Sequence, residues 1–412
     1  MEYRYDFTTL MDRRGKDAYA LDGVGTKTWQ FEPDAPDDGF DFIPMWVADM
    51  NFPTFPGVTD AIIERASHPA FGYFGISDAY YNAIISWRQG TPSGPEGRCA
   101  HADLTREQIG YENGVHGFIT SAVRVLTQPG DTILLHSPSY VGFRSDTWRQ
   151  KRRCSYSPLK LDEDGIWRMD LDDMERRIRE EKIRVMIFCS PHNPTGRVWE
   201  RRELEEMAAL LEAYHVDVIS DEIWADLTFA AHPHTPLQDV SPWAKEHVLA
   251  AYAPSKTFNI AGLIGSYHII YNEDLRRKVT EEGDLTNYNE MNVLSMHALC
   301  GGYCPEGRRW VGELNHALEE NGSFAMDFIQ NRLPGVHAAR PQGTYMMWLD
   351  IADYLKASGR TAEEVVSAGW RVGVGWQSGS FFEGPAHIRL NLASPMSRIR
   401  EAFERMEKYV FV

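Results

Sequence analysis

The sequence is poor in the features that mark several classes of protein. It has only five cysteines in 412 residues, an odd and scattered set, so we expect reduced thiols and no disulfide framework. The one close pair, Cys300 and Cys304, is interpreted as two ordinary thiols, and no metal site is expected there. No apolar run reaches the length of a signal peptide or of a membrane span, which predicts a soluble, cytoplasmic protein without a membrane partner.

Basic residues are also in short supply. The chain has 42 lysines and arginines against 59 aspartates and glutamates, which gives a formal net charge of -17. Such a charge repels polyanions, so nucleic acid is excluded as the main ligand. Hydrophobic residues make up 43% of the sequence, enough for two packed layers or two domains. The composition therefore indicates a globular protein of enzyme size.

Short apolar runs alternate with helical patterns over residues 105–271. This alternation is typical of strands joined by crossover helices, which form a mostly parallel sheet. Apolar positions recur at helical spacing over residues 115–126 and 204–211, as expected for helices with one buried face. The runs that we interpret as buried strands cover residues 132–136, 185–189, 216–220, 248–253 and 265–271.

The two ends of the chain differ from this central part. Prolines interrupt the first fifty residues and periodic segments are few, so residues 1–50 are expected to form an arm and part of a small domain. Residues 51–290 are expected to form the large domain. Residues 291–412 are expected to form a smaller α+β domain, with a strand over residues 343–350, a helix over residues 361–370 and a closing helix near the end.

Three polar motifs follow directly after predicted strands. Lys256 stands in the motif of residues 253–263, Asp221 in Ser-Asp-Glu-Ile-Trp, and Asn193 in Ser-Pro-His-Asn-Pro-Thr-Gly. Ligands bind at the carboxyl ends of strands in α/β sheets, so the three side chains are expected to share one crevice. A lysine there can form a Schiff base, an aspartate can pair with a protonated pyridine nitrogen, and an asparagine can donate to a ring oxygen. Each motif alone would read as a surface lysine or a plain turn.

A possible anion site precedes the helix that is predicted to start near Val115. Gly114 allows backbone amides to approach an anion at the positive end of this helix, and His116 is expected to serve through its backbone. Tyr140, which follows the strand over residues 132–136, can stack against a planar cofactor. The alternatives left open are a simple helix start for the glycine and a packing role for the tyrosine.

Taken in order, the motifs resemble those of fold-type I pyridoxal 5'-phosphate (PLP) enzymes, the aspartate aminotransferase superfamily, over nearly the whole chain. The sequence is most similar to the MalY/PatB-type cystathionine β-lyases, a group of carbon-sulfur lyases that also contains sequences described as aminotransferases. The motifs that carry this resemblance are Pro-Met-Trp-Val-Ala-Asp-Met-Asn-Phe (44–52), Phe-Gly-Tyr (71–73), Ser-Lys-Thr-Phe-Asn-Ile-Ala-Gly-Leu (255–263), Gly-Thr-Tyr-Met-Met-Trp-Leu-Asp (343–350) and Ile-Arg-Leu-Asn-Leu-Ala (388–393).

The resemblance implies a fold and a set of site residues. The fold would be an α/β architecture with a mostly parallel seven-stranded sheet between helices and a smaller C-terminal α+β domain. Lys256 would be the Schiff-base lysine and Asp221 the pyridinium partner, with Asn193 at the ring hydroxyl and Tyr140 stacked on the ring. A homodimer with a shared active site is implied as well. The implied phosphate ligands are Gly114, Val115, His116, Ser255 and, from the neighbouring subunit, Tyr73. The implied substrate ligands are Arg389, Asn193 and Ala48.

Two positions depart from the pattern. Many aminotransferases place an arginine eight residues after the lysine, where this chain has Ile264. The departure resembles the β-lyase branch and shifts phosphate binding onto the helix end, Ser255 and Tyr73. The second departure is Trp224, where the superfamily usually has tyrosine and this branch often has histidine. An indole replaces neither hydrogen-bonding role faithfully.

The expected activity is a PLP-dependent β-elimination. An amino acid such as cystathionine or a cysteine S-conjugate would be cleaved to a thiol, pyruvate and ammonia, with the amine of Lys256 removing the Cα proton. Transamination shares the first steps and stays open, as does a regulatory binding role on the same fold. The stretch from Leu285 to Met296, with Asn287, Tyr288, Asn289 and Asn292, is interpreted either as part of the substrate pocket or as a polar loop.

Overall fold

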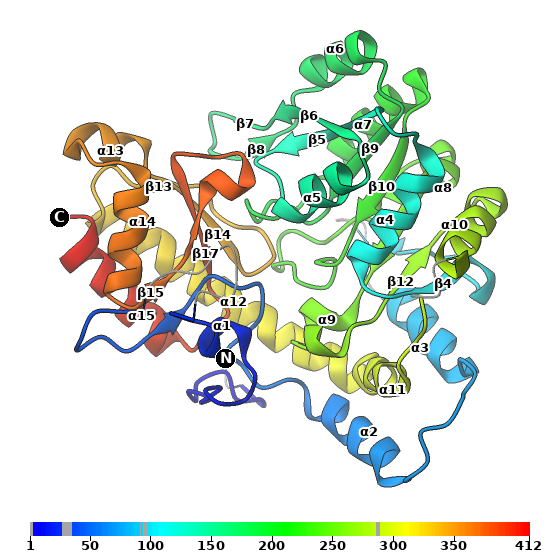
Figure 1. Ribbon diagram of the computed structural model, residues 1–412, viewed down its shortest axis with the longest axis horizontal. Helices are drawn as coiled ribbons and strands as arrows, with labels where there is room; N and C mark the ends of the chain where they lie inside the picture. Colours follow the sequence, from blue (N-terminus) through cyan, green and yellow to red (C-terminus); the bar gives the residue numbers. More distant parts are fainter. Residues whose placement is uncertain (1–2, 27–34, 91, 94–97, 286–288) are drawn as a thin grey trace.

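A seven-stranded sheet forms the core of the larger part of the protein, on the right in Figure 1. The computed structural model describes the chain apart from residues 1–2, 27–34, 91, 94–97 and 286–288. All strands of this sheet are parallel except β12, which runs antiparallel to both of its neighbours. In spatial order the strands are β4 (Ile109–Glu112), β12 (Ser266–Ile269), β11 (Val248–Tyr252), β10 (Asp217–Asp221), β9 (Val185–Cys189), β5 (Thr132–Ser137) and β6 (Arg153–Pro158).

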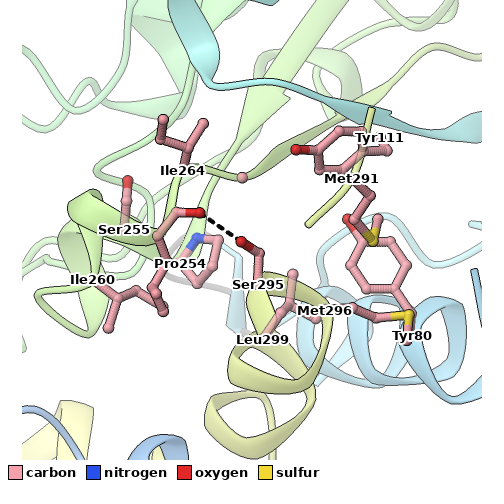
Figure 2. A pocket seen from close by; sticks show the side chains of 12 residues that line it. Tyr80, Tyr111, Pro254, Ser255, Ile260, Ile264, Met291, Ser295, Met296 and Leu299 are labelled. Carbon is pink, nitrogen blue, oxygen red and sulfur yellow. Dashed lines mark hydrogen bonds between the residues drawn. The ribbon is translucent and has the colours of Figure 1, made fainter. Parts of the chain in front are cut away.

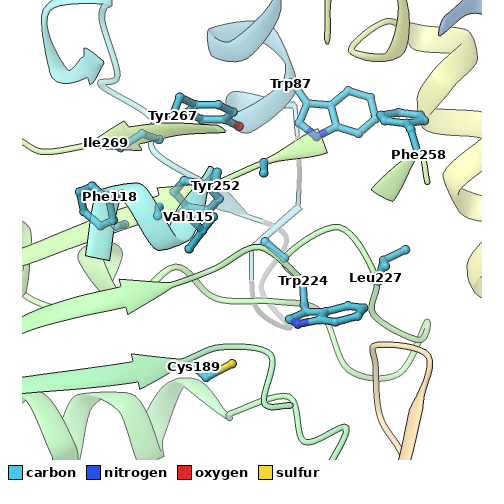
Figure 3. Packing of buried hydrophobic residues seen from close by; sticks show 14 of the residues in the cluster. Trp87, Val115, Phe118, Cys189, Trp224, Leu227, Tyr252, Phe258, Tyr267 and Ile269 are labelled. Carbon is cyan, nitrogen blue, oxygen red and sulfur yellow. The ribbon is translucent and has the colours of Figure 1, made fainter. Parts of the chain in front are cut away.

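Helices cover both faces of the sheet because its inner strands are apolar on both sides. Ile133 and Leu135 pack in one core together with Phe118, whereas Leu134 between them packs on the opposite face with Leu204. Figure 3 shows part of the first core, around Phe118 and Tyr252. The helices of the first face are α4 (Val115–Leu126), α5 (Val141–Arg149) and α10 (Glu273–Leu285), and those of the second are α6 (Leu171–Glu181), α7 (Arg201–Tyr214) and α8 (Pro242–His247).

A second, antiparallel sheet lies in the C-terminal part of the chain. Its strands, in spatial order, are β13 (His337–Ala338), β14 (Met346–Asp350), β17 (His387–Asn391) and β16 (Gln377–Ser378). Around it lie α13 (Ala352–Ser358), α14 (Ala362–Arg371), α15 (Met396–Arg405) and the π-helical turn η5 (Met406–Val410). Near the start of the chain, β1 (Ile43–Pro44) pairs in parallel with β15 (Val374–Gly375), so residues before position 50 join this C-terminal part.

The long helix α12 (Pro305–Arg332) connects the two parts (Figure 1). Its Trp310 and Leu314 belong to the core beside the large sheet, and its Phe328 and Ile329 belong to the core beside the small sheet. The remaining helices and strands are α1 (Tyr19–Asp22), α2 (Pro56–Ser67), α3 (Asp78–Gln89), α9 (Pro254–Thr257), α11 (Val293–Gly302), β2 (Pro92–Ser93), β3 (Arg98–Cys99), β7 (Lys160–Leu161) and β8 (Trp167–Arg168).

The structure confirms the α/β fold class and the five strands and two crossover helices expected from the sequence. The expected C-terminal strand and helix are also present, as β14 and α14. The edge strands β4 and β6 were not foreseen, because their polar residues give no continuous apolar run. Among the residues that the structure describes, no helix is long and apolar enough to cross a membrane.

Candidate active site

A cavity of about 250 Å³ opens at the carboxyl ends of the parallel strands. Strands β9, β10 and β11 each end beside it, which follows from their shared direction in the sheet. The structure therefore brings together the three motifs that the sequence places after strands. Among the residues that line the cavity are Ala48, Gly114, Val115, His116, Tyr140, Asn193, Asp221, Trp224, Ser255, Lys256 and Ile264.

Lys256 reaches the cavity from the short helix α9, which begins two residues after β11 ends. Its Nζ donates a hydrogen bond to the backbone oxygen of Ala48 at 2.8 Å. The same Nζ lies 5.9 Å from the ring centroid of Trp224. Burial lowers the pKa of Lys256 to about 8, although the carboxylate of Asp49 acts in the opposite direction. The unprotonated amine is therefore far more accessible near neutral pH than in a free lysine.

Asp221 is the last residue of β10 and is only 4% exposed. Its Oδ1 accepts a hydrogen bond from the backbone N–H of Ile223 at 3.1 Å. No lysine or arginine forms an ion pair with it among the described residues. Burial raises the pKa of Asp221 to about 6. The carboxyl group thus faces the cavity in a setting that favours a cationic partner supplied from outside the chain.

The first turn of α4 forms another wall of the cavity. Gly114, the residue before this helix, has φ of +80°, a conformation that side chains other than glycine rarely adopt. The first turn of α4 is the positive end of the helix dipole, where backbone N–H groups can donate to an anion. With Ser255 on the opposite wall, this end of the cavity suits an anion such as a phosphate group.

Arg389 projects from β17 and is buried next to the cavity. Its guanidinium donates to Oδ1 of Asn193 at 3.1 Å, to the backbone oxygen of Trp46 at 2.9 Å, and to Oε1 of Gln377. Burial lowers the pKa of Arg389 to about 10. None of these acceptors is charged, and within the described part of the chain its Nε has no partner. A buried arginine without a carboxylate is a strong candidate for binding one.

Asn193 and Ala48 connect the elements around the cavity. The side-chain oxygen of Asn193 accepts from Arg389, which leaves its amide group to donate on the cavity side. The backbone oxygen of Ala48 accepts from both Lys256 Nζ and the hydroxyl of Tyr345, the latter at 2.9 Å. Ala48 therefore holds the amine of Lys256 through its backbone.

Tyr140 lies at the cavity with its hydroxyl directed to a histidine. Nε2 of His116 is 3.1 Å from the Tyr140 hydroxyl, and Nδ1 of the same ring is 2.6 Å from Oδ2 of Asp146. The sequence had suggested only a backbone role for His116. In the structure its side chain also lines the cavity and contacts Tyr140.

The two departures from the family pattern both lie at the cavity. The indole of Trp224 packs edge-to-face against the ring of Tyr345, with centroids 4.7 Å apart. Ile264 lies between this cavity and a smaller apolar one, which is lined by Tyr80, Tyr111, Met291, Met296 and others (Figure 2). Its φ of +48° is unusual for a β-branched residue.

Two sets of expected residues lie outside the cavity. Tyr73 is fully exposed, at 111%, and does not line the cavity of its own chain. The second set is the stretch from Leu285 to Met296. In it, Asn289 accepts a hydrogen bond from the backbone N–H of Asn113, and Asn292 caps the start of α11. Asn287 and Tyr288 fall outside the described residues. Of the close cysteine pair, Cys304 caps the start of α12. The described residues contain no group of side chains that could hold a metal ion.

Several site residues had not been identified from the sequence: Trp46, Asp146, Tyr345 and Gln377. Asp146 and Tyr345 bond to residues that line the cavity, and Trp46 and Gln377 bond to Arg389 beside it. Trp46 and Tyr345 stand in motifs already noted, and Asp146 lies six residues after Tyr140 in the helix that follows it. Only Gln377 had no sequence signal.

The sequence and the fold have clear relatives. Cystathionine β-lyase PatB of Bacillus subtilis (strain 168) is 30% identical over 370 residues, which cover 89% of this chain and 92% of PatB. Protein MalY of Escherichia coli (strain K12) is 28% identical over 406 residues, which cover 96% of each chain. The crystal structure of the PLP-bound C-S lyase from Staphylococcus hominis superposes with a TM-score of 0.85 at 28% identity and covers 98% of each chain.

The relatives agree with a family-wide comparison. The sequence profile of the family "Aminotransferase class I and II" matches residues 41–406, which include both sheets and every residue that lines the cavity. This confirms the resemblance that the motifs had indicated. The chain belongs to the aminotransferase class I and II family.

Proposed function

We propose that this protein is a PLP-dependent carbon-sulfur β-lyase that cleaves cystathionine or a cysteine S-conjugate. The observation that carries the proposal is that the Lys256 amine and the Asp221 carboxylate, which forms no ion pair among the described residues, line the same cavity. The relatives PatB and the Staphylococcus hominis C-S lyase, whose names state these activities, support the same conclusion.

The residues of the cavity fit PLP by charge and by position. Asp221 is a buried carboxylate that would gain a cationic partner in the pyridinium nitrogen. The amide of Asn193 would donate to the ring hydroxyl, and Tyr140 would stack on the ring. Gly114, Val115, His116 and Ser255 would hold the phosphate, chiefly through backbone N–H groups at the start of α4.

Bound PLP supplies an electron-withdrawing ring that stabilises negative charge at the substrate Cα. The protein supplies the proton transfers and the orientation. Lys256, with its pKa of about 8, has enough free amine near neutral pH to accept the Cα proton. The backbone oxygen of Ala48 keeps this amine in place within the cavity.

Arg389 is the proposed anchor of the substrate α-carboxylate. Its planar guanidinium can bind a carboxylate with two parallel hydrogen bonds. Trp46, Asn193 and Gln377 fix its position without neutralising its charge. With the carboxylate fixed, the Cα–H bond can be held in a constant direction relative to Lys256, which is the geometric requirement for proton abstraction.

We also propose that the enzyme is a cytoplasmic homodimer with a shared site. Phe71 and Phe74 are exposed on either side of the fully exposed Tyr73, an arrangement that suits burial against a second copy of the chain. Tyr73 would then reach the phosphate of the neighbouring subunit. In the same proposal residues 51–290 form the cofactor-binding domain, residues 291–412 the small domain, and residues 1–50 an arm that contributes to the small domain.

The proposal is tested by reconstituting the purified protein with PLP and incubating it with cystathionine. A β-lyase releases pyruvate and a thiol in equal amounts, and the variant Lys256→Ala releases neither. A parallel reaction with an amino acid and 2-oxoglutarate is scored for glutamate. Formation of glutamate without pyruvate would show that the enzyme is an aminotransferase instead.

Transamination is the second candidate because the same residues serve it. Removal of the Cα proton by Lys256 and binding of the carboxylate by Arg389 are common to both reactions. The family itself is described by aminotransferase activity. The two reactions differ only after the proton has left Cα, so the products decide between them.

A further inference from the structure

Three side chains form a hydrogen-bonded chain at the edge of the cavity. Asp146 on α5 contacts Nδ1 of His116 at 2.6 Å, and Nε2 of His116 contacts the hydroxyl of Tyr140 at 3.1 Å. The His116 side chain is 51% exposed, whereas that of Asp146 is 9% exposed. The middle residue, His116, is therefore half exposed and lines the cavity together with Tyr140, whereas the far end, Asp146, is buried.

Gly142 leaves room for the rings of His116 and Tyr140. A Cβ atom at Gly142 would lie 2.3 Å from Cε1 of His116 and 2.5 Å from Cε1 of Tyr140. Both distances are far below a van der Waals contact, so the two rings occupy the space that a side chain at position 142 would need. The contact between His116 and Tyr140 depends on this glycine.

The hydrogen bonds assign a different role to each ring nitrogen of His116. The carboxylate of Asp146 accepts from Nδ1–H of His116, which leaves Nε2 to exchange a proton with the Tyr140 hydroxyl. The hydrogen bond to Asp146 raises the pKa of His116. The other charged groups that act on the imidazole are Asp221 from β10, which favours its cationic form, and Lys256 from α9, which opposes it.

Tyr140 has a different electrostatic setting. Burial raises the pKa of Tyr140 to about 12, while the nearby Arg389 acts in the opposite direction. Asp221, Asp146 and Cys189 also act on its hydroxyl. By itself such a phenol is too weak an acid to protonate a thiolate, whose conjugate acid has a pKa of about 8.5 in the case of cysteine. A histidinium hydrogen-bonded to the phenol removes this mismatch, because the proton that is finally lost is that of the imidazole.

Resting on the β-lyase function proposed above, we propose that Asp146, His116 and Tyr140 form a proton relay that delivers a proton from solvent to the departing sulfur. When the Cβ–S bond breaks, the sulfur keeps the electron pair. The hydroxyl proton of Tyr140 moves to the sulfur, and the Nε2 proton of His116 moves to the phenol oxygen. His116 is left neutral with its Nδ1–H on Asp146, and water returns the Nε2 proton. His116 passes on a proton in this scheme, whereas Asp146 is a positioning residue, since it acts through His116.

The relay predicts that the cost of disabling it depends on the leaving group. Asp146→Asn and His116→Gln in the holoenzyme should lower kcat about tenfold with cystathionine, whose alkyl thiolate needs protonation. With S-(4-nitrophenyl)-L-cysteine, whose thiolate leaves without help, the loss should be clearly smaller. Asp217→Asn is the matched control, because Asp217 pairs with His247 at 2.8 Å at the opposite end of β10 and outside the cavity.

The outcomes separate the two proposals. If the wild type releases thiol and both variants lose activity equally with the two substrates, or lose none, the relay is wrong and the β-lyase function stands. If the wild type releases no thiol from either substrate, the β-lyase function is wrong and the relay fails with it. The use of two variants guards against a folding defect in one of them.

Histidine NMR of the holoenzyme, which follows the titration of His116, tests the hydrogen bonds among Asp146, His116 and Tyr140 without turnover. We expect Asp146→Asn to lower the midpoint of the His116 titration and Asp217→Asn to leave it unchanged, because only Asp146 bonds to this ring. Gly142→Ala should also shift this midpoint, since the added methyl group displaces the His116 ring without changing any charge. A His116 midpoint that none of the variants moves would overturn the relay.

Discussion

Two acidic residues that follow each other in the sequence, Asp221 and Glu222, have opposite surroundings. Both are buried at the end of β10. Glu222 accepts from the hydroxyl of Tyr252 at 2.6 Å and bonds to Nε2 of His234 at 2.7 Å. Burial alone would raise the pKa of Glu222, but these partners lower it. Asp221 has one backbone donor, from Ile223, and burial raises its pKa to about 6.

The difference teaches how to distinguish a structural charge from a functional one. Burying a carboxylate is costly, and Glu222 recovers this cost through partners of its own chain. Asp221 has no such partner among the described residues, so its anion is less stable than that of Glu222 until a cation enters the cavity. Burial is the same at both positions, and the missing partner is what identifies the functional residue.

The largest effect is expected for the base that works beside Asp221. Lys256→Ala should lower β-lyase activity by about 10⁴-fold or more, because it removes both the proposed covalent attachment of the cofactor and the proposed proton acceptor. Lys245→Ala is the matched control, since Lys245 pairs with Asp103 away from the cavity. Pyruvate release and the absorbance of the reconstituted protein measure the two functions. Activity that survives in Lys256→Ala would contradict the site assignment.

Asp221→Asn should separate activity from stability. We expect kcat to fall roughly 10²- to 10³-fold, because the amide cannot hold the pyridine nitrogen protonated. The cofactor-free variant should nevertheless be more stable than the wild type above pH 6. A folded-state pKa raised from 3.8 to about 6 means that the carboxylate loses stability as the pH rises through this window. The full difference corresponds to about 3 kcal/mol.

Urea denaturation of the cofactor-free proteins measures this difference. The stability advantage of Asp221→Asn should be absent below about pH 4 and complete above pH 6. An advantage that does not depend on pH would show that the carboxylate is not the cause.

Glu222→Gln should behave in the opposite way. It removes the anion that His234 and Tyr252 share, so the free energy of unfolding should fall by about 2 to 3 kcal/mol at neutral pH. The loss should shrink as the pH falls below the ordinary glutamate range, since a lowered folded-state pKa stabilises the protein only above it. Its kcat, measured well below the unfolding temperature, should change far less than that of Asp221→Asn. Equal losses of kcat in the two variants would remove the contrast between them.

The smallest of these effects concerns Arg389, whose buried guanidinium has no carboxylate partner among the described residues. Arg389→Lys keeps the positive charge but loses the planar pair of donors, so KM for cystathionine should rise about tenfold with a smaller change in kcat. Arg371→Lys, on the exposed pair with Asp37, is the control. Steady-state kinetics at saturating PLP measure KM and kcat of both variants. An unchanged KM would place the substrate carboxylate elsewhere.

The sequence predicted the inner strands well because each is a continuous apolar run between turns, as in residues 185–189. It also placed Lys256, Asp221 and Asn193 together, since strand ends in a parallel sheet meet at one edge. It could not predict the hydrogen bonds of Arg389 to Trp46 and Gln377, which depend on side-chain packing between distant segments. The edge strand β6 was missed because its polar residues give no apolar signal.

Strand β1 gives the site a mechanical property. Residues 43–45 bond to the C-terminal part through Ile43 N to Gly373 O at 2.7 Å and Asn391 N to Met45 O at 2.8 Å. The segment continues to Ala48, whose carbonyl holds the Lys256 amine. A rotation of the small sheet against the large one would therefore carry Arg389 and this carbonyl as one piece. Capture of the substrate carboxylate and release of the lysine would be a single movement of the enzyme.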